Sequence, residues 1–310
     1  MKKVINIFLL FIILACSSKS TLETYKDQVS YAINQSPVIN PLGTSSLFYQ
    51  DLYYGSAERN NFDLMVPEEG NAIGVVIFFH GGSFLFNDKS DAYNEPYSSI
   101  ISNLINENVA IVNANYSFLS SSNSIGLTTS LSDGTLLLNH IRSIASKLDL
   151  NANKIILVGA SSGAGISLWN GLQAEYNQGV LGIVALATQS TYNLYKWEPL
   201  FPDISVNEIT QISQDFQLLF SLFYGGEVVT QEQLDAVDFI EFMDPSDPEL
   251  YLYNTAGNEV LRPDGSIDLD ILYHSIRHTD ALRAKAIEEG FSTSGAFQES
   301  PDAFVLRLLN

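Results

Sequence analysis

The sequence predicts an α/β fold built on a doubly wound, mainly parallel sheet. The first observation is a set of continuous apolar runs, typical of strands buried on both faces, at 74–79, 109–113, 154–158 and 180–187. The second observation is that segments of helical length and pattern alternate with these runs, at about 96–107, 132–148 and 164–175. Such alternation is typical of parallel strands joined by helices that cross over both faces of one sheet.

Two further segments extend the predicted sheet, and one interrupts it. Residues 47–54 and 61–66 are short β-rich runs that predict an antiparallel pair ahead of the parallel strands. Residues 188–245 break the alternation, which resumes with a strand at 250–253, so we expect a cap over the carboxyl edge of the sheet. The aromatic residues of this cap predict either an acyl or aryl pocket or a plain core between cap and sheet: Trp197, Phe201, Phe216, Phe220, Phe223 and Tyr224.

The composition is that of a folded, acidic chain. Its 310 residues include 35 acidic and 15 basic side chains, a formal charge of −20, while 46% are hydrophobic and only 16% are charged. A strongly negative field repels phosphate backbones, so binding to nucleic acid is not expected. The single cysteine excludes an internal disulfide framework and a metal site built from several cysteines, and no cofactor is expected.

Residues 1–15 predict a targeting segment. Two lysines precede an apolar run that is too short for a membrane span, which is typical of a signal peptide. The residues before Cys16 resemble the bacterial lipobox, in which the cysteine is lipidated and becomes the mature N-terminus. We therefore expect a lipid-anchored protein of the bacterial cell envelope; an ordinary signal followed by a buried cysteine is the alternative. Residues 16–45 are expected to form a tether and 46–310 the folded domain.

Two glycine motifs carry the predicted chemistry. A buried strand runs into GASSG, a G-x-S-x-G sequence between strand and helix that exposes Ser161 as a nucleophile. The small flanking residues allow neighbouring backbone to approach this strained turn. Another buried strand runs into His80, Gly81 and Gly82, where backbone N–H groups can turn toward a developing oxyanion. We expect the N–H groups of Gly81, Gly82 and Ser162 to form an oxyanion hole.

On these motifs the chain resembles the α/β-hydrolase superfamily, in particular the carboxylesterase branch that is similar to hormone-sensitive lipase and carries an HGG oxyanion loop. The resemblance spans roughly residues 50–260 and includes a lead-in with Tyr54, Gly55, Arg59, Asn60, Asp63, Leu64 and Pro67. It implies an α/β-hydrolase fold and hydrolysis of a carboxylic ester by Ser161 through an acyl-enzyme. An acid and a histidine should then follow Ser161 in chain order.

The acid does not stand where the resemblance places it. In the family it lies in the loop after the strand that follows the cap, and this loop holds Gly257 or Asn258 at the expected position. Glu259 is the replacement that we expect, because a carboxylate slightly further along the same loop can still orient an imidazole. Asp264 and Asp268 are more distant alternatives.

The base is displaced as well. The family's histidine follows the last strand near the C-terminus, but no histidine follows His278 in this chain. We expect His80 to orient the oxyanion loop and His140 to be an ordinary helix residue. His274 and His278 lie four residues apart on a predicted helix. We expect His274 to be the base, because this helix begins near the active-site edge of the sheet and descends away from it.

The same helix face has two other interpretations. Asp270, His274 and His278 recur at i, i+4 and i+8, which is also typical of a polar stripe supported by ion pairs. Two histidines four residues apart can hold zinc, but no third ligand stands at a recognisable spacing, so no metal site is expected.

Two functions follow from these patterns. The first is a membrane-anchored serine carboxylesterase that acts on a small-molecule ester, with Ser161, His274 and Glu259 as a displaced triad. The second is a catalytically inactive protein that keeps the hydrolase scaffold and binds a ligand in the capped cleft. The missing C-terminal histidine motivates the second, because loss of a general base typically costs about 10²–10⁴-fold in rate.

Overall fold

The computed structural model describes residues 21–226 and 228–310. The expected signal peptide and Cys16 lie outside these residues. One eight-stranded sheet forms the centre, with strand order β1-β2-β4-β3-β5-β6-β7-β8. Its strands are β1 (Ser46–Tyr53), β2 (Asn61–Pro67), β3 (Gly74–Phe79), β4 (Val109–Ala114), β5 (Ile155–Ala160), β6 (Val180–Leu186), β7 (Glu249–Tyr253) and β8 (Thr293–Ser294).

The sheet is parallel from β4 to β8. β1 pairs antiparallel with β2, and β2 pairs antiparallel with β4; all other neighbours are parallel. Every residue of β3, β4 and β5 is buried, because helices cover both faces of these central strands. The predicted doubly wound, mainly parallel sheet is confirmed.

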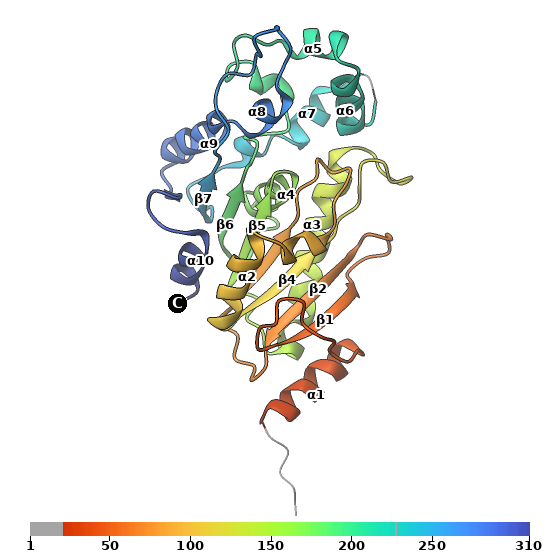
Figure 1. Cartoon of the computed structure of the whole chain (residues 1–310), viewed down its shortest axis with the longest axis vertical. Coiled ribbons are helices and arrows are strands. Elements are labelled where there is room, and N and C mark those ends of the chain that lie inside the picture. Colours follow the sequence, from red (N-terminus) through yellow and green to blue (C-terminus); the bar gives the residue numbers. More distant parts are fainter. Residues whose placement is uncertain (1–20, 227) are drawn as a thin grey trace, which may run out of the picture.

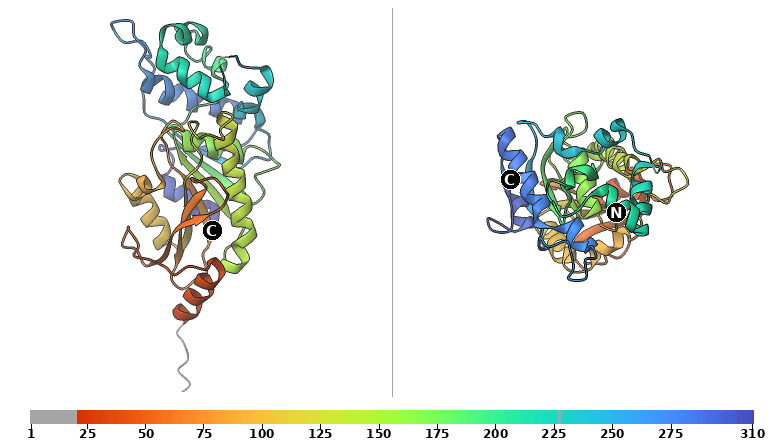
Figure 2. Two further views of the ribbon diagram at one scale, coloured as in Figure 1. Left: turned by 90° about the vertical axis from the view of Figure 1, so that its right-hand side faces the viewer. Right: turned by 90° about the horizontal axis from the view of Figure 1, so that it is seen from above.

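Helices form a layer on each face of the sheet, as Figure 1 and the left view of Figure 2 show. α2 (Tyr97–Asn106) and α10 (Pro301–Leu309) cover one face, where Ile101 and Phe304 join a common apolar cluster with the strands. α3 (Leu127–Ile144) and α4 (Ser162–Gly171) cover the other face. Two short 3₁₀ turns, η1 (Lys89–Tyr93) and η2 (Ala145–Leu148), complete this part of the chain.

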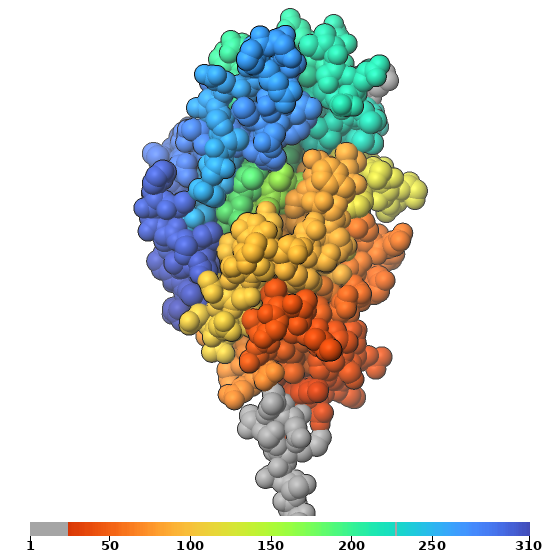
Figure 3. All heavy atoms as spheres, in the orientation of Figure 1, coloured from red at the N-terminus to blue at the C-terminus, as the bar shows by residue number. Residues whose placement is uncertain are grey.

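The cap consists of two insertions rather than one. The first, expected at about 188–245, contains η3 (Leu194–Trp197), α5 (Val206–Ile212), α6 (Gln214–Tyr224), α7 (Gln231–Ala236) and η4 (Phe239–Phe242). The second follows β7 and carries α8 (Leu269–His274), which leads into α9 (Ile276–Glu289). The Tyr273 ring packs edge-on against the Trp197 ring, with their centroids 5.8 Å apart, so the second insertion contacts the first. Together they form the end of the molecule opposite α1 (Figures 1 and 3).

The segment expected to be a tether is part of the domain from residue 21 onward. α1 (Thr21–Ile33) places Tyr25 and Val29 in the core, one helical turn apart. The Tyr25 hydroxyl donates to Leu148 O at 2.9 Å, and Val38 N donates to Phe48 O at 2.8 Å, which attaches the following residues to β1. The prediction missed this helix because its apolar face is narrow. Among the described helices, none is long and apolar enough to cross a bilayer.

Candidate active site

Ser161 lies at a sharp turn between β5 and α4. Its backbone has φ 50° and ψ −118°, a strained conformation for a residue other than glycine. Its N–H donates to Leu186 O at 2.8 Å, which ties the turn to the neighbouring strand β6. Glycine is required at Gly163, because a Cβ there would collide with the carbonyl oxygen of Phe79. These constraints hold the Ser161 side chain at the carboxyl edge of the sheet, as the G-x-S-x-G motif predicts.

A serine, an imidazole and a carboxylate lie in series at this edge. Ser161 Oγ is 3.0 Å from His274 Nε2, and His274 Nδ1 is 2.8 Å from Asp270 Oδ1. A proton on Nδ1, donated to Asp270, leaves Nε2 to accept the Ser161 hydroxyl. This is the order of groups that makes a serine nucleophilic.

The carboxylate in contact with His274 is not the one that we expected. Glu259 is exposed, and in the described chain it forms no hydrogen bond with His274. Asp268 instead caps the start of α8, accepting from Ile271 N, and Asp264 accepts from Ser266. Asp270 contacts His274 because a spacing of four residues puts these two side chains on one face of α8. The spacing of Asp270 and His274 was visible in the sequence, but it also fitted a polar stripe on the helix surface.

Three buried side chains hold the backbone around His274. The His278 imidazole, the Gln189 amide and the Asn254 amide donate to the carbonyl oxygens of Leu272, Tyr273 and Ser275 at 2.8, 2.8 and 2.9 Å, respectively. The last carbonyls of a helix have no partner within the helix, so the bonds to Leu272 O and Tyr273 O satisfy the end of α8, while Ser275 O also accepts from His278 N. They also fix the position of His274 relative to the sheet. The sequence patterns did not single out Gln189 or Asn254.

His278 is fully engaged in this framework. Its Nε2 bonds the Leu272 carbonyl, and its Nδ1 accepts from the backbone N–H of Ser190 at 3.2 Å and lies 3.0 Å from the Ser190 hydroxyl. Burial lowers the pKa of His278 to about 4, so the ring is neutral near pH 7. Both ring nitrogens therefore have partners in the protein, and His274 is the histidine of this helix pair that faces Ser161.

The glycine loop after β3 lies directly against Ser161. A Cβ on Gly81 would be 3.1 Å from Ala160 O and 3.4 Å from Ser161 Cβ. Gly82 has φ 121°, and a side chain there would collide with Phe86 O, so this turn requires glycine. Within the described chain, the backbone N–H groups of Gly81, Gly82 and Ser162 have no hydrogen-bond acceptor. These are the donors that the sequence predicts for an oxyanion hole; Gly81 lies against Ser161, and Ser162 follows Ser161 in the chain.

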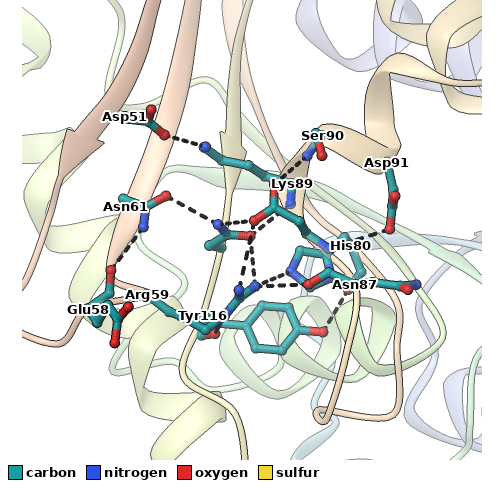
Figure 4. A network of polar contacts seen from close by, with 12 residues as sticks. Asp51, Glu58, Arg59, Asn61, His80, Asn87, Lys89, Ser90, Asp91 and Tyr116 are labelled. Atoms are coloured by element: carbon teal, nitrogen blue, oxygen red, sulfur yellow. Dashed lines mark hydrogen bonds and ion pairs between the residues drawn. The ribbon is translucent and has the colours of Figure 1, made fainter.

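A polar network supports this loop from behind (Figure 4). Arg59 Nη2 donates to His80 Nε2 at 3.2 Å and to Asn115 Oδ1 at 2.9 Å. Because the guanidinium can only donate, His80 Nε2 accepts and its Nδ1–H donates to Gly81 O at 2.6 Å. Burial lowers the pKa of His80 to about 4, which keeps this neutral form near pH 7. His80 thus contacts the loop as expected, and it does not reach Ser161.

A small apolar pocket lies beside Ser161, between the sheet edge and the cap. Besides Ser161 and Ser162, it is lined by Ser83, Phe84, Gln189, Tyr192, Trp197, Leu219, Phe223 and Tyr273. Of the cap aromatics expected at such a pocket, only Trp197 and Phe223 line it. The other four are buried in the core of the cap, as the second interpretation expects.

The chain is similar to known proteins in both sequence and structure. The model of the BD-FAE family matches residues 62–270. No curated protein sequence matches the chain. Similar solved structures include a truncated carbohydrate esterase from gut microbiota, with 16% identity, a TM-score of 0.57 and coverage of 81% of this chain and 87% of that one. An inhibited esterase B from Lactobacillus rhamnosis has 14% identity, a TM-score of 0.59 and coverage of 93% and 92%.

A thermophilic esterase from the Planctomycetes species Thermogutta terrifontis is also similar, with 13% identity, a TM-score of 0.55 and coverage of 81% of this chain and 80% of that one. At these identities the likeness establishes the fold. The sheet, its helices and the matched region agree with an α/β-hydrolase fold, which the sequence predicted.

Proposed function

Because the chain belongs to the BD-FAE family, an α/β-hydrolase esterase family, we propose that it hydrolyses carboxylic esters with Ser161 as its nucleophile. The observation that carries this proposal is the 3.0 Å contact between Ser161 Oγ and His274 Nε2, in line with Asp270. The three groups come from two separate parts of the chain, the β5–α4 turn and the second cap insertion. Their alignment at one sheet edge therefore depends on the tertiary fold.

In the proposed reaction, His274 Nε2 takes the proton of Ser161 while Oγ attacks the carbonyl carbon of the ester. The carbonyl oxygen becomes an oxyanion, which the N–H groups of Gly81, Gly82 and Ser162 stabilise. His274 then gives its proton to the departing alcohol, and an acyl-enzyme remains. Water, deprotonated by His274, attacks this acyl group and releases the acid and the free Ser161 hydroxyl.

The pocket favours an uncharged acyl group. Its walls are mainly aromatic and aliphatic, and the polar atoms of Gln189 are already engaged, Nε2 with Tyr273 O and Oε1 with the Tyr192 hydroxyl. A charged acyl group would lose its hydration without gaining a partner. We propose that the substrate is a small-molecule ester whose acyl group is short and apolar.

The test of the nucleophile is p-nitrophenyl butyrate turnover by the full-length protein in mild detergent. Ser161→Ala should lower kcat by about 10³-fold or more, since the members of a triad act as a unit. Ser143→Ala removes an exposed hydroxyl on α3 and should leave the rate unchanged. Equal rates for the wild type and Ser161→Ala would refute the proposal.

A fluorophosphonate probe separates this proposal from that of an inactive binding protein. An activated Ser161 should be labelled stoichiometrically, whereas His274→Ala should label much more slowly. The argument for an inactive scaffold was the absence of a base at the family's usual position, and the position of His274 weakens that argument. Absence of labelling, together with ligand-dependent thermal stabilisation, would favour the binding protein.

We also propose that Cys16 is lipidated after removal of residues 1–15, which would hold the protein on a membrane of the cell envelope. The proposal rests on the sequence alone. Cys16→Ser should move the protein from the membrane fraction to the soluble fraction, and the matched change Ser17→Ala should not. Membrane association of Cys16→Ser at the wild-type level would contradict the anchor.

A further inference from the structure

We propose that Tyr116 is a positioning residue that aims the N–H groups of the oxyanion loop at the substrate. The inference rests on the proposed function, because it concerns the stabilisation of the oxyanion formed when Ser161 attacks. Tyr116 follows β4 and is fully buried behind the loop, so it does not touch the substrate. It acts through the backbone of His80 and Gly81.

The Tyr116 hydroxyl joins the two halves of the oxyanion hole. Its oxygen lies 2.9 Å from His80 O and 3.4 Å from Gly81 O, both in the loop after β3. It also lies 3.0 Å from the hydroxyl of Ser162, the residue after the nucleophile. The tyrosine has one proton, which it donates mainly to His80 O, with Gly81 O as a second and longer acceptor, so its oxygen accepts from the Ser162 hydroxyl. One side chain thus holds the loop and the start of α4 together.

Holding these two carbonyls determines where the N–H groups point. In a trans peptide, the C=O of one residue and the N–H of the next are opposed across a planar bond. The His80 and Gly81 carbonyls face Tyr116, so the N–H groups of Gly81 and Gly82 face away from it. Gly81 lies next to the Ser161 side chain, and within the described residues neither N–H has an acceptor. Both donors are therefore available to an oxyanion formed on an ester bound to Ser161.

The His80 side chain reinforces the same arrangement. Its Nδ1–H donates to Gly81 O at 2.6 Å, and its ring stacks on the Tyr116 ring with centroids 4.5 Å apart. Arg59 fixes the ring by donating to Nε2, and Figure 4 shows Arg59, His80 and Tyr116 in one cluster. Gly81 O is therefore held by an imidazole and a phenol at once. Preorganised donors of this kind need no rearrangement when the charge develops.

The test is Tyr116→Phe, which keeps the stacked ring and removes only the hydroxyl. Loss of a complete oxyanion donor costs about 10²–10³-fold in kcat, and here the donors stay but are less well aimed. We therefore expect kcat for p-nitrophenyl butyrate to fall by about 10–30-fold, with KM within about twofold. Tyr25→Phe is the matched control, because it also removes a hydroxyl bonded to a backbone carbonyl, Leu148 O, far from the site.

The inhibition constant Ki of a trifluoromethyl ketone separates this role from a purely structural one, because a loss of stability alone would not change it. The ketone forms an anionic adduct with the serine, so its Ki depends on the oxyanion hole. In Tyr116→Phe, Ki should rise by the same factor as kcat/KM falls, and Tyr25→Phe should change neither. Ser162→Ala, which keeps its backbone N–H, should show the same parallel change at about threefold. Unchanged kcat/KM and Ki in Tyr116→Phe, with only a lower melting temperature, would overturn the inference.

The outcomes separate this inference from the proposed function. If the wild type turns over the ester and depends on Ser161, but Tyr116→Phe behaves like Tyr25→Phe, only the role of Tyr116 is refuted. If the wild type neither hydrolyses the ester nor binds the ketone, both proposals fail. Should Tyr116→Phe not fold, the parallel change of Ki and kcat/KM in Ser162→Ala decides the inference by itself.

Discussion

Asp270 is expected to contribute less to catalysis than the acid of a buried triad. The change Asp270→Asn removes the charge beside His274 and keeps the shape of the side chain. Where the triad acid is buried, the corresponding change lowers kcat by about 10⁴-fold, because the amide enforces the wrong imidazole tautomer. The side chain of Asp270 is 79% exposed, whereas that of His274 is 26% exposed. The carboxylate is therefore well hydrated and screened by water.

The magnitude follows from this exposure. Exposed ion pairs contribute about 0.2–1 kcal/mol, and a tenfold change in rate corresponds to about 1.4 kcal/mol. Loss of the charge should thus lower kcat by about fivefold at most. The exposed amide of the variant can also turn toward solvent, so it need not enforce the wrong tautomer of His274.

The assay is kcat for p-nitrophenyl butyrate at pH 6 to 9, with Glu259→Gln as the matched control. Glu259 is the carboxylate that sequence reasoning favoured, and it has no contact with His274, so its removal should leave kcat unchanged. A loss of about 10³-fold or more in Asp270→Asn would refute the argument from exposure. A normal kcat in Asp270→Asn with a large loss of kcat in Glu259→Gln would indicate that Glu259 is the acid.

Three further predictions concern stability and specificity. Since the folded pKa of His278 is about 4 and its ordinary value is 6.5, stability should fall as the pH drops from 6.5 toward 4. His278→Gln should flatten this fall, which urea midpoints at pH 7 and 4.5 would reveal. Gly163→Ala places a Cβ against a backbone carbonyl of β3 and should lower the unfolding free energy by about 2–3 kcal/mol. Gly257→Ala is the control, because the space around it is open; thermal melts should show a loss of stability for the first variant and none for the second. Leu219→Trp should fill part of the pocket, so kcat/KM for p-nitrophenyl butyrate should fall by about tenfold relative to that for p-nitrophenyl acetate. Equal losses for both esters would contradict an acyl pocket.

The sheet and the nucleophile turn could be predicted from the sequence because both are encoded locally. Continuous apolar runs mark strands buried on both faces, and β3, β4 and β5 are fully buried. The G-x-S-x-G turn around Ser161 needs small residues for a steric reason that any member of the fold shares, as the collision at Gly163 illustrates. Short-range patterns of this kind can be recognised in the sequence without knowledge of the tertiary contacts.

The acid and the second cap insertion could not be predicted with the same success, because they depend on long-range contacts. Asp270 and His274 fit a surface stripe as well as a catalytic pair, and only the path of the chain from β7 to α8 distinguishes the two. That path is fixed by Gln189 and Asn254, which hold the carbonyls beside His274 from distant positions in the sequence. Neither residue belongs to a motif. The N-terminal helix has a narrow apolar face, and the hydroxyl of its Tyr25 bonds to the distant Leu148 O, so neither feature forms a local pattern.

The location of the proposed base on α8 separates the proposed catalytic groups into two units of different local stability. Ser161 is attached to fully buried central strands, while Asp270 and His274 share a peripheral helix of six residues, whose Leu272 and Tyr273 carbonyls accept from the side chains of His278 and Gln189. Such peripheral elements open at a lower free energy than the core of a domain. If α8 opened locally, His274 and Asp270 would move away together and leave Ser161 in place without its proposed base. Heating should therefore end catalysis before the sheet unfolds.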